Sequence, residues 1–221
     1  QDAKKILEML EKAQQGRVAN WHRFNTINRA DTVKAFDNLY NLVHHRQVSD
    51  LNGEFKGIPA VIVSPGPSLR KNINVLKKFK GRVLIVCVLR ALGTLLEKNI
   101  DPDIVIQVDP HDLKEMHTNW NGTKSNLWEE WIEKNDTSRI KIFVSSMYSQ
   151  PELFNINVQN SFWMNPTDDL NDHFPLEIFK YKRAGGSVSH SAFDMLVEFG
   201  CSSIALIGQD LAYSSDNDVY I

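Results

Sequence analysis

The chain contains 221 residues, and its formal net charge of −2 comes from 25 Lys and Arg against 27 Asp and Glu. With 42% hydrophobic and 24% charged residues, it has the composition of an ordinary soluble globular protein, which excludes disorder, collagen and coiled coil for the whole chain. At about 150 residues per domain, the length predicts one sizeable core with an appendage. No run of about 18 apolar residues occurs, so we expect no membrane partner.

The spacing of apolar residues changes near residue 57. Residues 2–45 contain no proline and one glycine, with apolar side chains mostly three or four positions apart, which predicts helices. Beyond residue 57, short β-branched runs alternate with helical segments, as in parallel βαβ units. We expect strands at residues 60–64, 82–88, 103–109, 140–146 and 203–210, and helices at residues 69–79, 91–98, 127–134 and 187–199. Residues 147–185 receive no assignment.

These elements predict an α/β fold: a Rossmann-like, mostly parallel sheet with helices on both faces, preceded by a helical amino-terminal segment. We divide the chain into that segment, residues 1–56, and a nucleotide-binding α/β domain, residues 57–221. Cys87 and Cys201 lie in or beside apolar runs, where reduced thiols pack as small hydrophobes, so we expect a cytoplasmic protein.

Positive charge is concentrated in one part of the domain. Between Glu54 and Glu97 the chain carries eight basic residues and no acidic one, and residues 97–136 are rich in acids. A nucleic-acid groove requires broader, unopposed positive charge, so we expect a small phosphorylated ligand and no nucleic-acid partner. For Lys77, Lys78 and Lys80 we favour a solvated helix face.

The loop after the first expected strand is a candidate ligand site. It contains Ser64, Gly66, Pro67 and Ser68, at a strand end where α/β proteins bind ligands. Gly66 permits a tight turn, and Ser68 is placed to cap a helix whose free N–H groups form a phosphate or carboxylate site. The loop matches neither G-x-G-x-x-G nor the Walker A pattern, which disfavours NAD and P-loop chemistry. A plain strand-to-helix connection is the alternative.

A second loop and two carboxylates add to this candidate site. Gly185 and Gly186 precede Ser187 and open the approach to a helix end, and His190 is a candidate acid, base or phosphate contact, with capping or packing as its alternative. Asp109 and Asp210 each end an apolar strand, so we expect them to converge at the carboxyl edge of the sheet as catalytic or ligand-holding groups. Their alternative is to cap the following turns. We assign no metal site.

Two blocks of sequence resemble the Maf family of motility-associated, flagellin-modifying glycosyltransferases. They are the run from FKGIPAVIVSPGPSL to DIVIQVDP and the run GGSVSHSAFDMLVEFGCSSIALIGQDLAY, so the likeness spans about residues 54–213. The resemblance implies a sialyltransferase-like domain that moves a nonulosonic acid of the pseudaminic or legionaminic kind from a CMP-sugar to Ser or Thr of flagellin. It implies that Gly66, Pro67 and Ser68 hold the phosphate, and that residues 185–187 hold the cytidine end. No cofactor is required.

Two other functions stay open at this stage. The same order of motifs is similar to archaeal hydroxymethylpterin diphosphokinases, which transfer a diphosphate from ATP and need magnesium. A non-catalytic nucleotide-binding or flagellin-binding module is the third possibility. The chain stops eleven residues after Asp210. No histidine follows His190 to act as the general base that the resemblance implies, so we expect this chain to be truncated at its C-terminus and to bind nucleotide without completing transfer.

Overall fold

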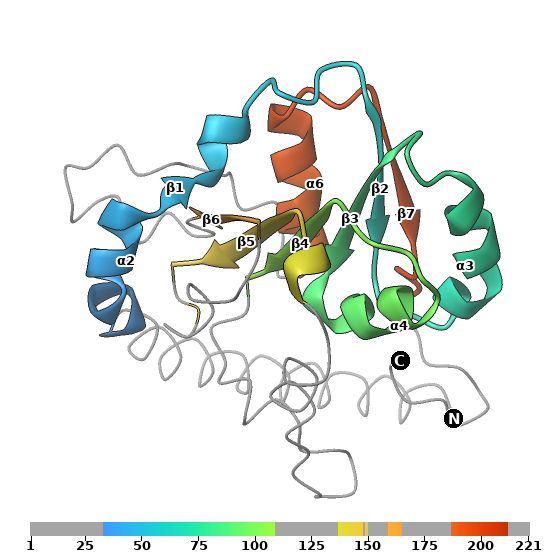
Figure 1. Ribbon diagram of the computed structural model, residues 1–221, viewed down its shortest axis with the longest axis horizontal. Coiled ribbons are helices and arrows are strands. Elements are labelled where there is room, and N and C mark those ends of the chain that lie inside the picture. The colour runs from blue at the N-terminus through green and yellow to red at the C-terminus, as the bar shows by residue number, and fades with distance from the viewer. Residues whose placement is uncertain (1–32, 109–136, 148, 150–158, 165–186, 212–221) are drawn as a thin grey trace, which may run out of the picture.

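The computed structural model describes residues 33–108, 137–147, 149, 159–164 and 187–211. These residues form one sheet in the order β1-β6-β5-β4-β3-β2-β7, in which all the strand pairs are parallel (Figure 1). The strands are β1 (Arg46–Gln47), β2 (Pro59–Val63), β3 (Leu84–Val88), β4 (Ile104–Gln107), β5 (Ile142–Ser146), β6 (Asn160–Met164) and β7 (Ser203–Ile207). The predicted parallel α/β fold is confirmed.

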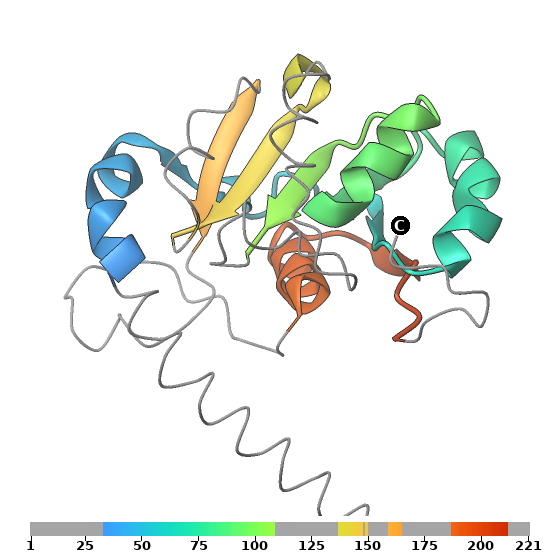
Figure 2. The ribbon, with the colours of Figure 1, turned by 90° about the horizontal axis from the view of Figure 1, so that it is seen from below.

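Helices cover both faces of this sheet. They are α2 (Leu39–His44), α3 (Ser68–Lys78), α4 (Leu92–Glu97) and α6 (Val188–Glu198), with short 3-10 turns η1 (Val48–Leu51), η2 (Leu89–Ala91) and η3 (Thr137–Arg139). Figure 2 shows α3 and α4 on one face and α6 on the other. The chain crosses from β2 to β3 in one direction and from β6 back to β7 in the opposite one, so right-handed connections place α3 and α6 on opposite faces.

The core lies between these layers. Every residue of β3 and of β4 is buried, as expected of central parallel strands covered on both sides. α3 buries Leu69, Ile73 and Leu76, which recur at helical spacing, while its other face is mostly polar. β7 is the most exposed of the five-residue strands, because within the described residues it pairs only with β2.

Two strands were not predicted. β6 begins with Asn and Ser and lies inside residues 147–185, for which no element was predicted, and β1 has only two residues. Conversely, the strands expected at 103–109 and 203–210 end at Gln107 and Ile207, and residues 208–210 follow β7 as a loop. The helix expected at residues 127–134 lies outside the described residues.

The described part of the amino-terminal segment is packed against the sheet. Asn38 is fully buried and its Nδ2 donates to the carbonyl oxygens of Met147 (2.9 Å) and Ser149 (2.8 Å). Nε1 of Trp163 in β6 donates to the carbonyl oxygen of Leu42 at 2.9 Å. Val48 of η1 belongs to the main core. Residues 38–51 therefore share the core of the α/β domain, and the boundary at residue 56 stays a prediction.

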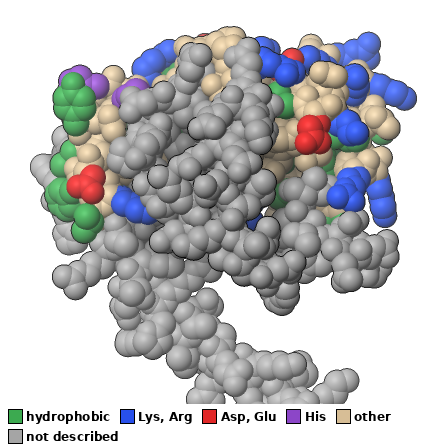
Figure 3. Space-filling model, turned by 60° about the horizontal axis from the view of Figure 1, so that its bottom comes forward, with side chains coloured by type: hydrophobic (Ala, Val, Ile, Leu, Met, Phe, Trp, Pro, Cys, Tyr) green, Lys and Arg blue, Asp and Glu red, His purple; other side chains and the backbone are tan. Residues whose placement is uncertain are grey.

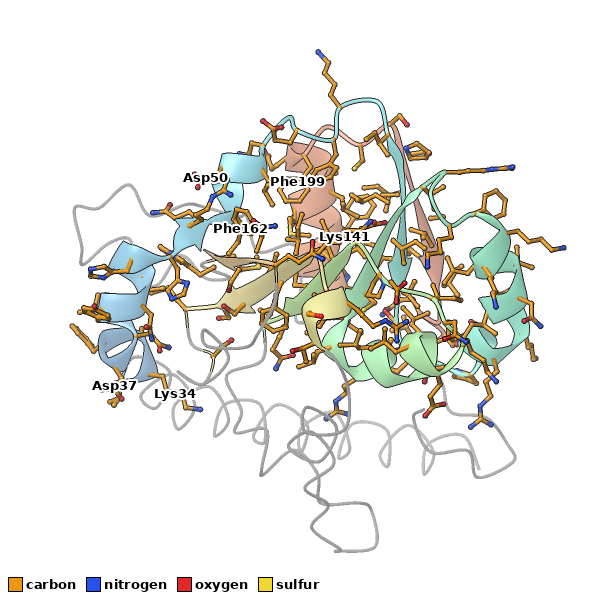
Figure 4. The ribbon with its side chains drawn as sticks, in the orientation of Figure 1. Lys34, Asp37, Asp50, Lys141, Phe162 and Phe199 are labelled. Carbon is orange, nitrogen blue, oxygen red and sulfur yellow. The ribbon has the colours of Figure 1, made fainter. Side chains whose placement is uncertain are left out.

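Charged side chains at the amino edge of the sheet are paired with one another. Asp101 accepts hydrogen bonds from Lys80 (2.9 Å) and Arg139, and Asp103 accepts from Lys141 (2.6 Å) and from the backbone of Ile85 (2.9 Å). Figure 4 shows Lys141 beside the start of β5 and Phe199 at the carboxyl end of α6, which leads into the start of β7. Lys80 therefore forms an ion pair, while Lys77 and Lys78 are exposed as expected. This edge is opposite to the one where ligands are expected.

We expect Asp101→Asn to reduce stability by up to about 1 kcal/mol at neutral pH. Partial burial alone would raise the pKa of Asp101, but hydrogen bonds and charges from Lys80 and Arg139 outweigh it and hold that pKa below its ordinary value. A carboxyl with a lowered folded pKa stabilises the fold above its unfolded pKa, about 3.9, and loses this contribution as the pH falls through the folded pKa.

Urea unfolding at several pH values measures this effect. The difference between wild type and Asp101→Asn should be present at pH 7 and should shrink below about pH 4. Asp50→Asn is the matched control, because Asp50 pairs with Arg46 at 3.7 Å in an exposed position. An equal, pH-independent loss in both variants would show that the pair at Asp101 has no special role.

Candidate functional site

The candidate site begins where β2 and β7 end side by side. Val63 is paired with Ile207, so the segments that follow both strands leave the sheet at the same level. The N–H of Ser64 donates to the carbonyl oxygen of Ile207, and the N–H of Gly66 donates to that of Gly208, each at 2.8 Å. The first predicted loop is therefore joined by backbone hydrogen bonds to residues that follow it by more than 140 positions.

Two glycines allow this close approach. A Cβ atom on Gly66 would overlap the carbonyl oxygen of Gly208 and the carboxylate of Asp210. A Cβ atom on Gly208 would overlap the carbonyl oxygen of Ser64, and Gly208 has a φ of +75°, which also favours glycine. Gly66 was expected to permit a tight turn. In the structure, the contact between the two loops requires that residue 66 has no side chain.

Asp210 lies at the amino end of α3. Its Oδ2 accepts a hydrogen bond from the N–H of Ser68 at 2.8 Å, so Asp210 caps this helix, whereas the alternative considered for this residue was a cap of the turn that follows it. The prediction that Ser68 caps α3 is wrong: the N-cap is Pro67, and Ser68 is the first helical residue. The Oγ of Ser68 instead accepts from the N–H of Gly208 at 3.2 Å. The helix is thus capped by a carboxylate that is distant in sequence.

A cluster of hydroxyl groups joins these loops to α6. The Oγ of Ser189 donates to Oε1 of Gln209 at 2.6 Å and lies 3.2 Å from the Oγ of Ser64. The Oγ of Ser187 donates to that of Ser189 at 3.3 Å. Ser64 and Ser189 are only 4% and 9% exposed, so this network lies under the surface and fixes the three segments relative to one another.

The second predicted loop meets the same edge. Ser187 is the N-cap of α6, and its Oγ accepts from the N–H of Ser189 at 3.3 Å. The N–H of His190 donates to the carbonyl oxygen of Ser187 at 3.0 Å, and the His190 residue is exposed. Gly185 and Gly186 lie outside the described residues. Ligand contacts from residues 185–187 and from His190 stay predictions.

That Asp109 and Asp210 converge at the carboxyl edge stays a prediction, because Asp109 lies outside the described residues. The strand before it, β4, ends at Gln107, which is buried at the carboxyl edge. In the sheet, β3 and β2 lie between β4 and β7, so the ends of β4 and β7 are about 14 Å apart at the usual strand spacing. A ligand contacting both carboxylates would have to span the edge of the sheet.

Ser189 and Gln209 were missed by the sequence analysis. Gln209 stands next to Asp210 in the motif that resembles the Maf family, and Ser189 stands within the first turn after a predicted cap. Both signals were visible, but only the fold reveals that the two side chains meet. Ser64 was selected for its place after a strand, and the structure confirms that position at the carboxyl edge.

The surroundings of the site are partly cationic. Figure 3 shows Lys and Arg side chains gathered on the side of the molecule where α3 lies. Of the exposed basic residues of α3 and the turn after it, Arg70 and Lys71 lie in the first turn, beside the site, whereas Lys77, Lys78, Lys80 and Arg82 lie toward the amino edge of the sheet. Within the described part of the chain, no three His, Cys, Asp or Glu side chains are grouped to hold a metal ion. Both cysteines are free, and burial raises the pKa of each thiol, which disfavours the reactive thiolate.

Comparison with known proteins agrees with this fold. The structure defines an α/β protein of the parallel, Rossmann-like class, with polar loops gathered at the carboxyl edge of β2 and β7. The chain belongs to the MptE-like family, described as 6-hydroxymethylpterin diphosphokinase MptE-like, whose model matches residues 34–216.

The chain is also similar in structure to the MAf glycosyltransferase from Magnetospirillum magneticum AMB-1. The TM-score is 0.53 and the sequence identity is 16%, over 76% of this chain and 25% of that one. At this identity the similarity concerns the fold. No curated protein matches the chain. The predicted resemblance to both groups of enzymes is confirmed. No helix among the described residues is long and apolar enough to cross a membrane.

Proposed function

We propose that this chain provides the nucleotide-binding domain of a glycosyltransferase that moves a nonulosonic acid from a CMP-sugar to Ser or Thr of flagellin. The observation that supports it most is the hydrogen-bonded junction of three segments at the carboxyl edge: the loop after β2, the start of α6 and residues 208–210. Ligands of open α/β proteins bind at this edge. The similarity in fold to the MAf glycosyltransferase supports the reaction class.

The reaction itself is a group transfer. The acceptor hydroxyl oxygen attacks the anomeric carbon of the sugar, the bond from that carbon to the phosphate oxygen breaks, and CMP leaves with the electron pair. The hydroxyl proton must pass to a base. Asp210 is a candidate, because one of its oxygens is held by Ser68 while the residue is exposed, and His190 is another. No resident cofactor is needed, and we expect the reaction in the cytoplasm.

Binding of the phosphate has one geometric condition. The resemblance places it against Gly66, Pro67 and Ser68, but the N–H of Ser68 is already engaged by Asp210. A phosphate at that helix end would therefore have to take the place of this carboxylate, or bind beside it with the help of nearby basic side chains. The exposed Arg70 and Lys71 in the first turn of α3 would favour an anion in either position.

A second candidate function is the 6-hydroxymethylpterin diphosphokinase activity that the description of the matching family names. That reaction transfers a diphosphate and needs magnesium, for which carboxylates such as Asp210 are suitable ligands. Calorimetric titrations with CMP, with CTP and with ATP plus magnesium separate the two functions. Metal-independent binding of CMP is the expected result. Binding of ATP only with magnesium would favour the diphosphokinase, and binding of none would contradict both.

Gly186→Val is expected to abolish nucleotide binding. A branched side chain would occupy the approach to the amino end of α6 and would oppose any positive φ at this position. Calorimetry with CMP measures the effect, and the unfolding temperature reports whether the fold is intact. Gly53→Val is the matched control: Gly53 has a φ of +77°, so valine should reduce stability there, but an added Cβ atom would meet nothing within 4 Å and affinity for CMP should be kept. An intact Gly186→Val protein with unchanged affinity would make the second loop purely structural.

A further inference from the structure

Gln209 is held in place from both sides. Before it, Gly208 gives its N–H to Ser68 and accepts a hydrogen bond from Gly66. After it, the side chain of Asp210 is bound to the N–H of Ser68. The side chain of Gln209 is half-buried. Because of these hydrogen bonds, it extends from a backbone that the neighbouring loop fixes at the carboxyl edge. Such a fixed polar group has little freedom to lose when a ligand binds.

The orientation of the Gln209 amide is set by Ser189. A serine hydroxyl has one proton, and that of Ser189 is donated to Oε1 of Gln209 at 2.6 Å. Ser187 donates to the same Ser189 oxygen, which leaves that proton to Gln209. No other hydrogen bond to the Gln209 side chain occurs within the described residues. With one lone pair of its oxygen engaged by Ser189, the amide keeps both N–H donors of Nε2 without a partner among the described residues.

The neighbouring charge indicates what these donors recognise. An N–H pair binds an oxygen acceptor, either a neutral carbonyl or a phosphate. The carboxylate of Asp210, the next residue, opposes a phosphate at this point and has no such effect on a neutral oxygen. The amide also lies beside the start of α6, where the proposed function places the cytidine end of the nucleotide. A carbonyl of the pyrimidine base fits these conditions.

We propose that Nε2 of Gln209 donates a hydrogen bond to the carbonyl oxygen of the pyrimidine, and that Ser189 is the positioning residue that orients this amide. The inference rests on the proposed function, because it requires a cytidine nucleotide at this edge. It names the group that selects the base, which the sequence analysis did not assign. Both side chains lie within the described residues.

The first test replaces the donor without changing its size. Gln209→Glu keeps an oxygen for Ser189 and replaces the N–H donors by a second, charged oxygen. Its affinity for CMP and for cytidine, measured by calorimetry, should fall by about tenfold or more, the value of one lost hydrogen bond plus repulsion. Gln159→Glu is the matched control, since Gln159 lies at the amino edge, where it donates to Ser138. It should bind both ligands as wild type does.

The second test examines the positioning role. Ser189→Ala should weaken binding of CMP in the wild-type background and should have no additional effect when combined with Gln209→Leu, because the two side chains act as one unit. Ser189→Thr keeps the hydroxyl and should restore binding. Ser203→Ala, at the amino end of β7, controls for loss of a serine. Unfolding temperatures of all variants verify that each is folded.

The outcomes are distinguishable. A loss of affinity for cytidine as well as for CMP in Gln209→Glu supports the inference. A loss for CMP alone would assign the amide to a phosphate oxygen and overturn it, as would wild-type affinity for both ligands in a folded variant. Additive effects of Ser189→Ala and Gln209→Leu would overturn the positioning role. In each of these cases wild-type binding of CMP leaves the proposed function standing, whereas a wild-type chain that binds no cytidine compound overturns both.

Discussion

Gly208→Ala should destabilise the protein by about 4 kcal/mol or more, so that little folded protein is recovered. The new Cβ atom would overlap the carbonyl oxygen of Ser64, and this oxygen belongs to backbone that cannot move without breaking the hydrogen bonds between the two loops. The positive φ of Gly208 adds to the strain. Urea unfolding monitored by circular dichroism measures the change in the free energy of unfolding.

Gly81→Ala is the control for that experiment. Gly81 has a φ of +78°, nearly that of Gly208, but a Cβ atom there would meet nothing within 4 Å. Gly81→Ala should therefore reduce the free energy of unfolding only by what the positive φ costs an alanine, roughly 1–2 kcal/mol. The difference between the two variants isolates the contact between the loops. Equal losses would mean that the loops after β2 and β7 are not in the close contact described above.

Asp210→Asn should leave the unfolding temperature almost unchanged while nucleotide affinity or turnover falls about tenfold or more. Asn is nearly as good a helix cap as Asp, so its side-chain oxygen can still accept from the N–H of Ser68. What is lost is the negative charge, which a base, or a group that orders the nucleotide and acceptor, requires. Calorimetry with CMP measures the loss.

Asp210→Ala completes this comparison. It removes both the cap and the charge, so it should reduce stability by about 1 kcal/mol and affect function as Asp210→Asn does. If Asp210→Ala is destabilised and both variants retain full affinity and turnover, Asp210 is only a cap for α3. Asp210 would then have to be removed from the candidate site, and His190 would be the remaining candidate base among the described residues.

Much of the fold followed from the sequence because central parallel strands are buried on both faces. LIVCV in β3 and IVIQ in β4 are almost wholly apolar and are bounded by polar residues, so their positions could be predicted within about two residues. β6 could not, because its NSFWM sequence begins with polar residues. β1 is too short to show any periodicity. Both strands exist because they pair with segments distant in sequence, and a local sequence pattern does not indicate such pairing.

The candidate site was predictable to a similar extent. The carboxyl ends of β2 and β7 were recognised because glycine, serine and aspartate follow apolar runs. Hydrogen bonds across the fold could not be recognised in this way. A helix N-cap is normally sought among neighbours in sequence, but α3 receives its cap from Asp210, 142 residues away from Ser68. The contact between Ser189 and Gln209 likewise exists only once α6 and β7 are in place.

Hydrogen–deuterium exchange with and without CMP tests most directly whether a nucleotide binds at the carboxyl edge of β2 and β7. Saturating CMP should slow exchange in peptides that cover residues 64–70, 185–191 and 208–211. Peptides that cover the ion pairs of Asp101 and Asp103 at the amino edge should exchange as before. Protection at the amino edge, or no protection anywhere at a CMP concentration that saturates binding, would contradict a nucleotide site at this edge.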